Sequence, residues 1–108
     1  MRKGFAFAVA AVASLLAPAA ASAKPASRTA TVIVDKLTFG SVPANLRVGD
    51  TILWINRDLF RHSATAPGHF DVDLPAGARR QMVLRKAGLF PFLCKYHPGM
   101  KGVLKVGQ

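Results

Sequence analysis

Seven residues near the end of the chain, CKYHPGM at 94–100, hold three side chains that can bind a metal. Cys94, His97 and Met100 follow one another in steps of three residues, and Cys94 is the only cysteine in the 108-residue sequence. Pro98 and Gly99 predict a turn, which lets the three side chains fold toward one point. A thiolate, an imidazole and a thioether together form a ligand set that suits copper.

A three-coordinate copper plane requires a second imidazole, and His62 is the candidate. His62 follows the apolar run TILWIN (51–56) and a loop that begins NRDLF. In a sandwich of strands this loop can lie at the same end as residues 94–100. His69, in the segment APGHFDV, is an alternative or second ligand. The turn residues around His69 are more typical of a solvated histidine.

Short β-branched and apolar runs, separated by turn residues, predict an all-β domain. Strands are expected at 29–37, 51–56, 62–66, 79–86, 88–94 and 102–106, with turns over 39–50 and 67–77. Short strands at this spacing favour an antiparallel sandwich or barrel. Phe90, Phe92 and Cys94 alternate along one strand and therefore share a face, which two phenylalanines mark as the core side. Cys94 is then expected where that face meets a loop at the end of the sandwich.

The first 23 residues predict an export signal. Arg2 and Lys3 precede the apolar run GFAFAVAAVASLLAP, and ASA at 21–23 offers small residues for cleavage after Ala23. A membrane anchor is the alternative, because residues 4–23 carry no charge and are just long enough to span a bilayer. Pro18 and the many alanines favour a cleaved signal. We therefore expect a periplasmic protein with a flexible N-terminus at 24–28 and one domain over 29–108.

The chain is strongly basic, with a formal net charge of +10 at pH 7. Loss of Arg2 and Lys3 with the signal would leave +8, which favours acidic partners or anionic surfaces. Nucleic acid is an unsuitable partner for an exported chain that has no basic helix, zinc finger or RNA-binding motif. A single cysteine also excludes an internal disulfide and a dinuclear copper site with two bridging thiolates.

Two segments resemble the small blue-copper cupredoxins of the amicyanin and plastocyanin group. VGDTILWINRD resembles the family's strand that leads to its first histidine, and FPFLCKYHPGMKGVLKV resembles its metal loop and last strand. The resemblance spans about residues 29–106 and implies a Greek-key β-sandwich with one copper ion. By position it implies that the equatorial ligands are His62, Cys94 and His97, and that Met100 is a weak axial ligand. The family often has asparagine after the first histidine, where this chain has Ser63, a shorter tether between the ligand loops.

The function expected from these features is electron transfer, with copper cycling between Cu(I) and Cu(II). A periplasmic copper carrier or homeostasis protein that uses the same site is the alternative. An enzyme with a Cys94–His97 nucleophile is disfavoured, since no acid or amide in the loop orients His97 and the small domain leaves little room for a cleft. We expect a monomer without stable membrane insertion. Its redox partner would have an acidic surface, as on an exported c-type cytochrome or an oxidase.

Overall fold

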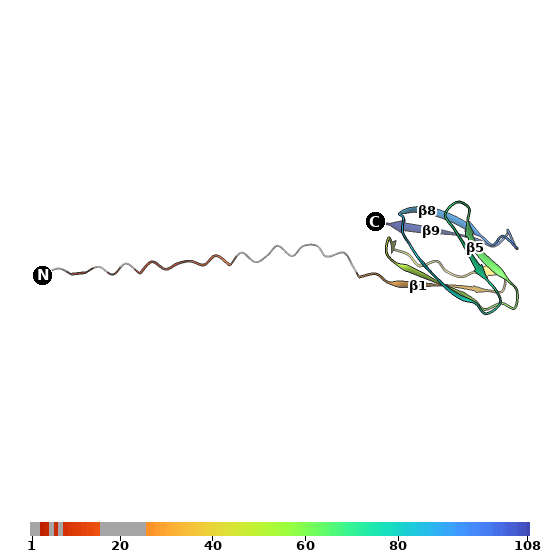
Figure 1. Ribbon diagram of the computed structural model, residues 1–108, viewed down its shortest axis with the longest axis horizontal. Coiled ribbons are helices and arrows are strands. Elements are labelled where there is room, and N and C mark those ends of the chain that lie inside the picture. Colours follow the sequence, from red (N-terminus) through yellow and green to blue (C-terminus); the bar gives the residue numbers. More distant parts are fainter. Residues whose placement is uncertain (1–2, 5, 7, 16–25) are drawn as a thin grey trace.

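The computed structural model describes residues 3–4, 6, 8–15 and 26–108 (Figure 1). Residues 16–25 lie outside the described residues, and with them the expected cleavage site after Ala23, so the export signal stays a prediction. In the part of the chain that is described, no helix is long and apolar enough to cross a membrane.

Nine strands make up residues 29–107. They are β1 (Thr29–Asp35), β2 (Thr38–Phe39), β3 (Leu46–Arg47), β4 (Thr51–Asn56), β5 (His62–Ala66), β6 (Phe70–Leu74), β7 (Arg79–Val83), β8 (Gly88–Leu93) and β9 (Lys101–Gly107). One sheet has the order β2-β1-β4-β7 and the other the order β3-β9-β8-β5-β6. The chain crosses between the sheets repeatedly, and the predicted Greek-key β-sandwich is confirmed.

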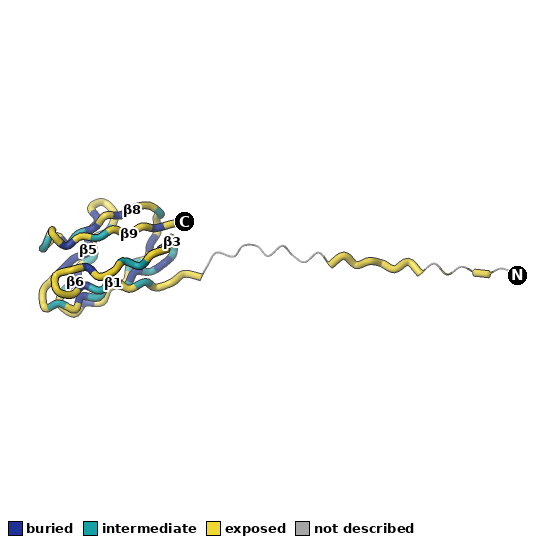
Figure 2. The backbone as a smooth tube through the Cα atoms, turned by 180° about the vertical axis from the view of Figure 1, so that it is seen from behind, coloured by how far each residue is buried: buried dark blue, intermediate teal, exposed yellow. Residues whose placement is uncertain are grey.

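The core lies between the two sheets, where buried residues gather (Figure 2). Strand β4 shows why this sequence forms a strand, because its side chains alternate between buried and half-buried along TILWIN. Trp54 is fully buried, as expected, and its ring meets those of Phe39 and Phe92 at centroid distances of 6.2 and 5.2 Å. The aromatic cluster therefore joins the two sheets through Phe92, which lies on the strand that leads to Cys94.

Two strand pairs are parallel in this sandwich, for which the sequence favoured an antiparallel arrangement. β1 pairs with β4 in parallel, and β3 pairs with β9 in parallel. The chain leaves the first sheet after β2, contributes β3 to the second sheet and returns as β4. Because the chain passes through the second sheet before it returns, β4 runs in the same direction as β1. Parallel strands need such a crossover and cannot be joined by a tight turn.

The segment 67–77, predicted as turns, contains strand β6 between two turns. Its residues Phe70, Val72 and Leu74 alternate in sequence and are half-buried or buried. The charged residues between them, Asp71 and Asp73, concealed this period of two. Strand β7 is shorter than expected and ends at Val83, because Leu84 turns into the loop and its N–H bonds to Asp50 O.

Two loops lie at the same end of the sandwich and position the predicted ligands. One connects β4 to β5 over residues 57–61, and the other connects β8 to β9 over residues 94–100 (Figure 1, green and blue). The pairing of β8 with β9 requires glycine at position 102. Gly102 lies opposite Phe92, and a Cβ atom there would overlap the phenyl ring. Phe92 can therefore pack inward, two residues before Cys94.

Candidate metal centre

The loop 94–100 is closed by its own backbone. The N–H of Cys94 donates to Met100 O at 3.0 Å, and the N–H of Met100 donates to His97 O at 2.8 Å. The N–H of His97 also donates to Cys94 O at 3.3 Å. Each residue of the predicted C-x-x-H-x-x-M set is thus bonded to the other two through the main chain. This arrangement holds the side chains in a fixed relation.

Three of the predicted ligand atoms converge from two loops. The Sγ atom of Cys94 lies 3.7 Å from Nδ1 of His62 and 3.7 Å from Nδ1 of His97. The sulfur and one ring nitrogen of each histidine all lie within 4.8 Å of one another. Cys94 and His62 are fully buried, and His97 is half-buried. Cys94 therefore lies where the sequence placed it, at the inner end of strand β8.

This donor set fits a single copper ion. Nitrogen and sulfur ligands bind a metal at about 2.0 and 2.3 Å, and atoms that share one ion at such distances lie close to the separations found here. One thiolate and two imidazoles form the trigonal set of blue-copper sites, to which a weak axial ligand is added. Met100 is buried in the same loop, and its role as that axial ligand stays a prediction.

A carboxylate lies behind His62, on the side away from Cys94. The Nε2 atom of His62 is 2.7 Å from Oδ2 of Asp58. Asp58 also accepts the N–H groups of Lys36 at 2.7 Å and Leu37 at 2.9 Å. Hydrogen bonding by Leu37 is the main cause that lowers the pKa of Asp58, and His62 and Lys36 add to it. Because an ionised carboxylate only accepts, this contact favours the tautomer with the proton on Nε2 of His62, which leaves Nδ1 free to bind a metal.

No protein-family model matches the chain. Amicyanin of Paracoccus denitrificans is 28% identical to it over 93 residues, which cover 80% of this chain and 71% of that protein. Among solved structures, the Cu(I) form of an amicyanin variant superposes with a TM-score of 0.62 at 25% identity, covering 76% of this chain and 85% of that one. The chain has a cupredoxin fold and is similar to amicyanin.

The same sandwich also occurs inside a larger copper protein. A Cu-containing nitrite reductase from Thermus scotoductus matches this cupredoxin with a TM-score of 0.60 and 28% identity. The match covers 80% of this chain but only 23% of the reductase. The likeness is therefore to about a quarter of that enzyme.

Ser63 ties the two ligand loops of this cupredoxin together. Its Oγ atom accepts the N–H of Lys95 at 3.0 Å and lies 2.8 Å from Oγ1 of Thr65. Thr65 donates to Asp71 at 2.8 Å, so Ser63 is the donor to Thr65. Asp71 also pairs with Nζ of Lys95 at 3.0 Å. A closed ring of bonds thus links both sides of the site, and a serine in place of asparagine still joins the loops.

The surface around His97 combines apolar side chains with paired charges. Tyr96 and Pro98 flank His97 in sequence and are exposed. Leu59 and Phe60 are exposed in the loop 57–61 that leads to His62, and Leu59 is 91% exposed. Arg61 binds Asp73 through two bonds of 2.9 and 2.7 Å. The guanidinium of Arg61 and Nζ of Lys95 each lie less than 6 Å from the Tyr96 ring centroid. Arg61 and Lys95, the cations beside Tyr96, therefore have acidic partners.

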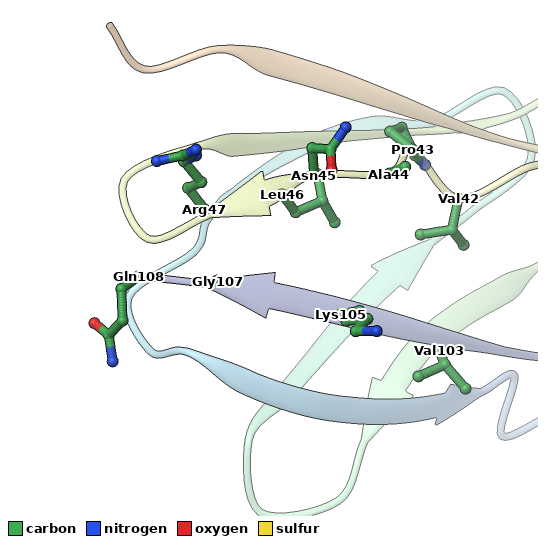
Figure 3. A pocket seen from close by; sticks show the side chains of 10 residues that line it. All are labelled: Val42, Pro43, Ala44, Asn45, Leu46, Arg47, Val103, Lys105, Gly107 and Gln108. Carbon is green, nitrogen blue, oxygen red and sulfur yellow. The ribbon is translucent and has the colours of Figure 1, made fainter. Parts of the chain in front are cut away.

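His69 lies apart from the three converging side chains. It is exposed in the turn between β5 and β6, and its ring meets that of Phe90 edge to face at a centroid distance of 5.0 Å. A surface pocket between residues 42–47 and the C-terminal part of β9 is lined by none of the predicted ligands (Figure 3). The metal site is thus confined to the end of the sandwich that holds the two loops.

Sequence reasoning missed the residues that support the ligands, chiefly Asp58, Thr65 and Asp71. Asp58 and His62 are four residues apart in a loop, and no regular period relates them. Asn56 shows the same difficulty, since its buried side chain bonds to Asp58 N, Phe60 O and Leu74 O. Aspartate and asparagine bonding to nearby backbone groups was the only sequence signal for such a loop.

Proposed function

We propose that this cupredoxin is an exported mononuclear copper protein that carries single electrons in the periplasm. His62, Cys94 and His97 hold the copper in the equatorial plane, and Met100 binds weakly along the axis. The observation that carries the proposal is the convergence of one thiol sulfur and two imidazole nitrogens from two loops. The copper, when bound, supplies a one-electron couple between Cu(I) and Cu(II).

The residues of the chain serve this function by limiting movement and water at the site. The backbone bonds within 94–100 and the Ser63–Lys95 bond restrain the ligands, which favours one geometry for both oxidation states. Cys94 and His62 are fully buried, with Phe92 packed beneath, and water is therefore kept from the thiolate. The half-buried ring of His97 is the part of the predicted ligand plane that is open to a partner.

Export and partner choice belong to the same proposal. The basic start, apolar run and ASA segment support cleavage after Ala23 and a periplasmic location. The resulting charge of +8 supports brief encounters with an acidic redox protein, such as an exported c-type cytochrome or an oxidase. Such encounters depend on electrostatic steering and small contact areas. We expect the protein to act as a monomer.

A copper carrier would use the same ligands but must release the ion. The burial of Cys94 and His62 disfavours release, because a competing ligand cannot reach either of them from solvent. Protein voltammetry combined with a Cu(I) chelator separates the two functions. We expect a reversible one-electron wave, and copper that stays bound for hours beside bicinchoninate in excess. Transfer of Cu(I) to the chelator within seconds, without a reversible wave, would identify a carrier instead.

A further inference from the structure

We infer that Asp58 is a positioning residue that holds His62 in one tautomer and biases the bound copper toward Cu(II). Asp58 is outside the predicted ligand set and acts only through the imidazole of His62. The inference rests on the proposed copper function and adds a determinant of the reduction potential to it.

The first part of the argument is the turn between β1 and β2. Lys36 and Leu37 have φ angles of 51° and 59°, in the left-handed region that residues with a Cβ atom rarely adopt. Two-residue hairpin turns of this kind favour Asn-Gly, and this chain has Lys-Leu. The unusual backbone directs two successive N–H groups at the carboxylate of Asp58. Successive N–H groups of this kind form an anion-binding concavity.

The second part is the placement of the carboxylate between that turn and the ligand. Oδ1 of Asp58 accepts from Lys36, while Oδ2 accepts from both Leu37 and His62. Its side chain is only 10% exposed, and the His62 ring is fully buried. The N–H of Asp58 is held in turn by Oδ1 of Asn56 at 2.9 Å. The carboxylate is thus fixed from three directions before a metal arrives.

These contacts require a carboxylate and exclude an amide. All three groups that face Asp58 donate, so an asparagine would have to direct its NH₂ group at a donor. The His62 ring lies between the negative charge of Asp58, at Nε2, and the predicted copper position, at Nδ1. A hydrogen-bonded carboxylate makes an imidazole ligand more basic, and in a buried site its charge favours the more positive metal ion.

A first test uses the unaltered protein without metal. In ¹⁵N spectra of histidine-labelled protein, we expect the proton of the His62 ring on Nε2, exchanging slowly with water. A proton on Nδ1 would overturn the inference, whatever the protein does with copper. This measurement needs neither a variant nor a bound metal, and it therefore remains informative if the proposed copper function is wrong.

A second test compares Asp58→Asn with Asp73→Asn, each loaded with one equivalent of Cu(II). Both variants lose one carboxylate, but Asp73 binds Arg61 and does not contact a predicted ligand. We expect Asp58→Asn to shift the Cu(I)/Cu(II) equilibrium at least tenfold toward Cu(I), since loss of such an outer partner typically changes metal affinity or activity by about tenfold to a hundredfold. A tenfold shift raises the potential by about 59 mV. We expect Asp73→Asn to change the equilibrium less than threefold.

Equal shifts in the two variants would overturn the inference, even if both proteins bind copper. If Asp58→Asn does not fold, Asp58→Glu takes its place, because it keeps the charge with a longer side chain. We expect Asp58→Glu, whose longer side chain displaces the carboxylate from His62, to shift the equilibrium toward Cu(I) by less than tenfold but by more than Asp73→Asn does. Failure of the unaltered protein to bind copper would contradict the proposed function alone, since the nitrogen spectra still decide the tautomer.

Discussion

At the scale of single residues, the site is made of two kinds of side chain. Cys94, His97 and His62 could be identified from the sequence because their chemistry is rare and their spacing is local. Asp58 and Thr65 could not, because polar residues of this kind occur throughout the loops and only the folded chain brings them to the ligands. The sequence therefore predicts which metal binds, and the structure shows which residues hold the ligands in place.

The predicted role of Met100 as axial ligand can be tested with a single substitution. We expect Met100→Gln to retain one copper ion, because the two histidines and the thiolate form the plane without it. The visible spectrum and the potential are expected to shift, since an axial ligand tunes both. Absorption spectroscopy and voltammetry of the variant provide the measurement. An unchanged spectrum and potential would show that Met100 only packs in the core.

Ser63 is expected to contribute to stability through the bond between the loops. Ser63→Ala leaves the N–H of Lys95 without its acceptor in a partly buried setting, which costs about 1 kcal/mol. Urea unfolding of the metal-free variant measures the change in the free energy of unfolding. Ser41→Ala, at an exposed serine, is the matched control and should be close to neutral. Equal effects of the two substitutions would exclude the tether.

At the scale of strands and turns, the sequence predicted most strands but not their partners. TILWIN and HSATA are strands β4 and β5 with the expected bounds, because the apolar alternation is local. The parallel β1–β4 and β3–β9 pairs depend on where the chain crosses between sheets, and no local pattern encodes that. Strand β6 was missed because Asp71 and Asp73 resemble turn residues, although their carboxylates bind Lys95 and Arg61.

Asp50 ties the start of β1 to the turn before β4. These bonds make the free energy of unfolding depend on pH in the acid range. Its buried carboxylate accepts the N–H groups of Arg28 at 2.9 Å and Arg47 at 3.0 Å. The bond from Arg28 is the main cause that lowers the pKa of Asp50 below the ordinary 3.8. The unfolded chain therefore binds the proton more readily, and this contribution is present above pH 5 and lost as the pH falls through the lowered value.

We expect the free energy of unfolding of the metal-free protein to fall as the pH is lowered below about 4. Asp50→Asn should be less stable at neutral pH by about 2 kcal/mol, because its NH₂ group faces a backbone donor. It should also depend less on pH in the acid range. Chemical unfolding at a series of pH values gives both quantities. A variant with the same acid dependence as the original protein would show that Asp50 is not responsible.

At the scale of the whole molecule, net charge and its distribution govern encounters. Arg57 is exposed in the loop that leads to His62, and Arg85 is exposed in the loop between β7 and β8, at the opposite end of the sandwich. Arg61 is less informative, because Asp73 already pairs with it. Arg57→Glu and Arg85→Glu therefore change the net charge equally, near the site and far from it.

We expect the second-order rate of electron transfer to an acidic cytochrome to fall steeply between 0.01 and 0.1 M salt. Over that range the screening length decreases from about 30 to about 10 Å. Stopped-flow kinetics should show a weaker salt dependence for Arg57→Glu than for Arg85→Glu. A rate that is flat or rises with salt would contradict attraction to an acidic partner.

The central claim is that Cys94, with His62 and His97, binds one copper ion as a redox centre. The most direct measurement is the absorption spectrum of the purified protein with one equivalent of Cu(II). We predict an intense visible band from thiolate-to-copper charge transfer, which a reductant bleaches and an oxidant restores. Cys94→Ser, which removes the thiolate, should lack the band. A colourless protein, or a band that persists in Cys94→Ser, would contradict the claim.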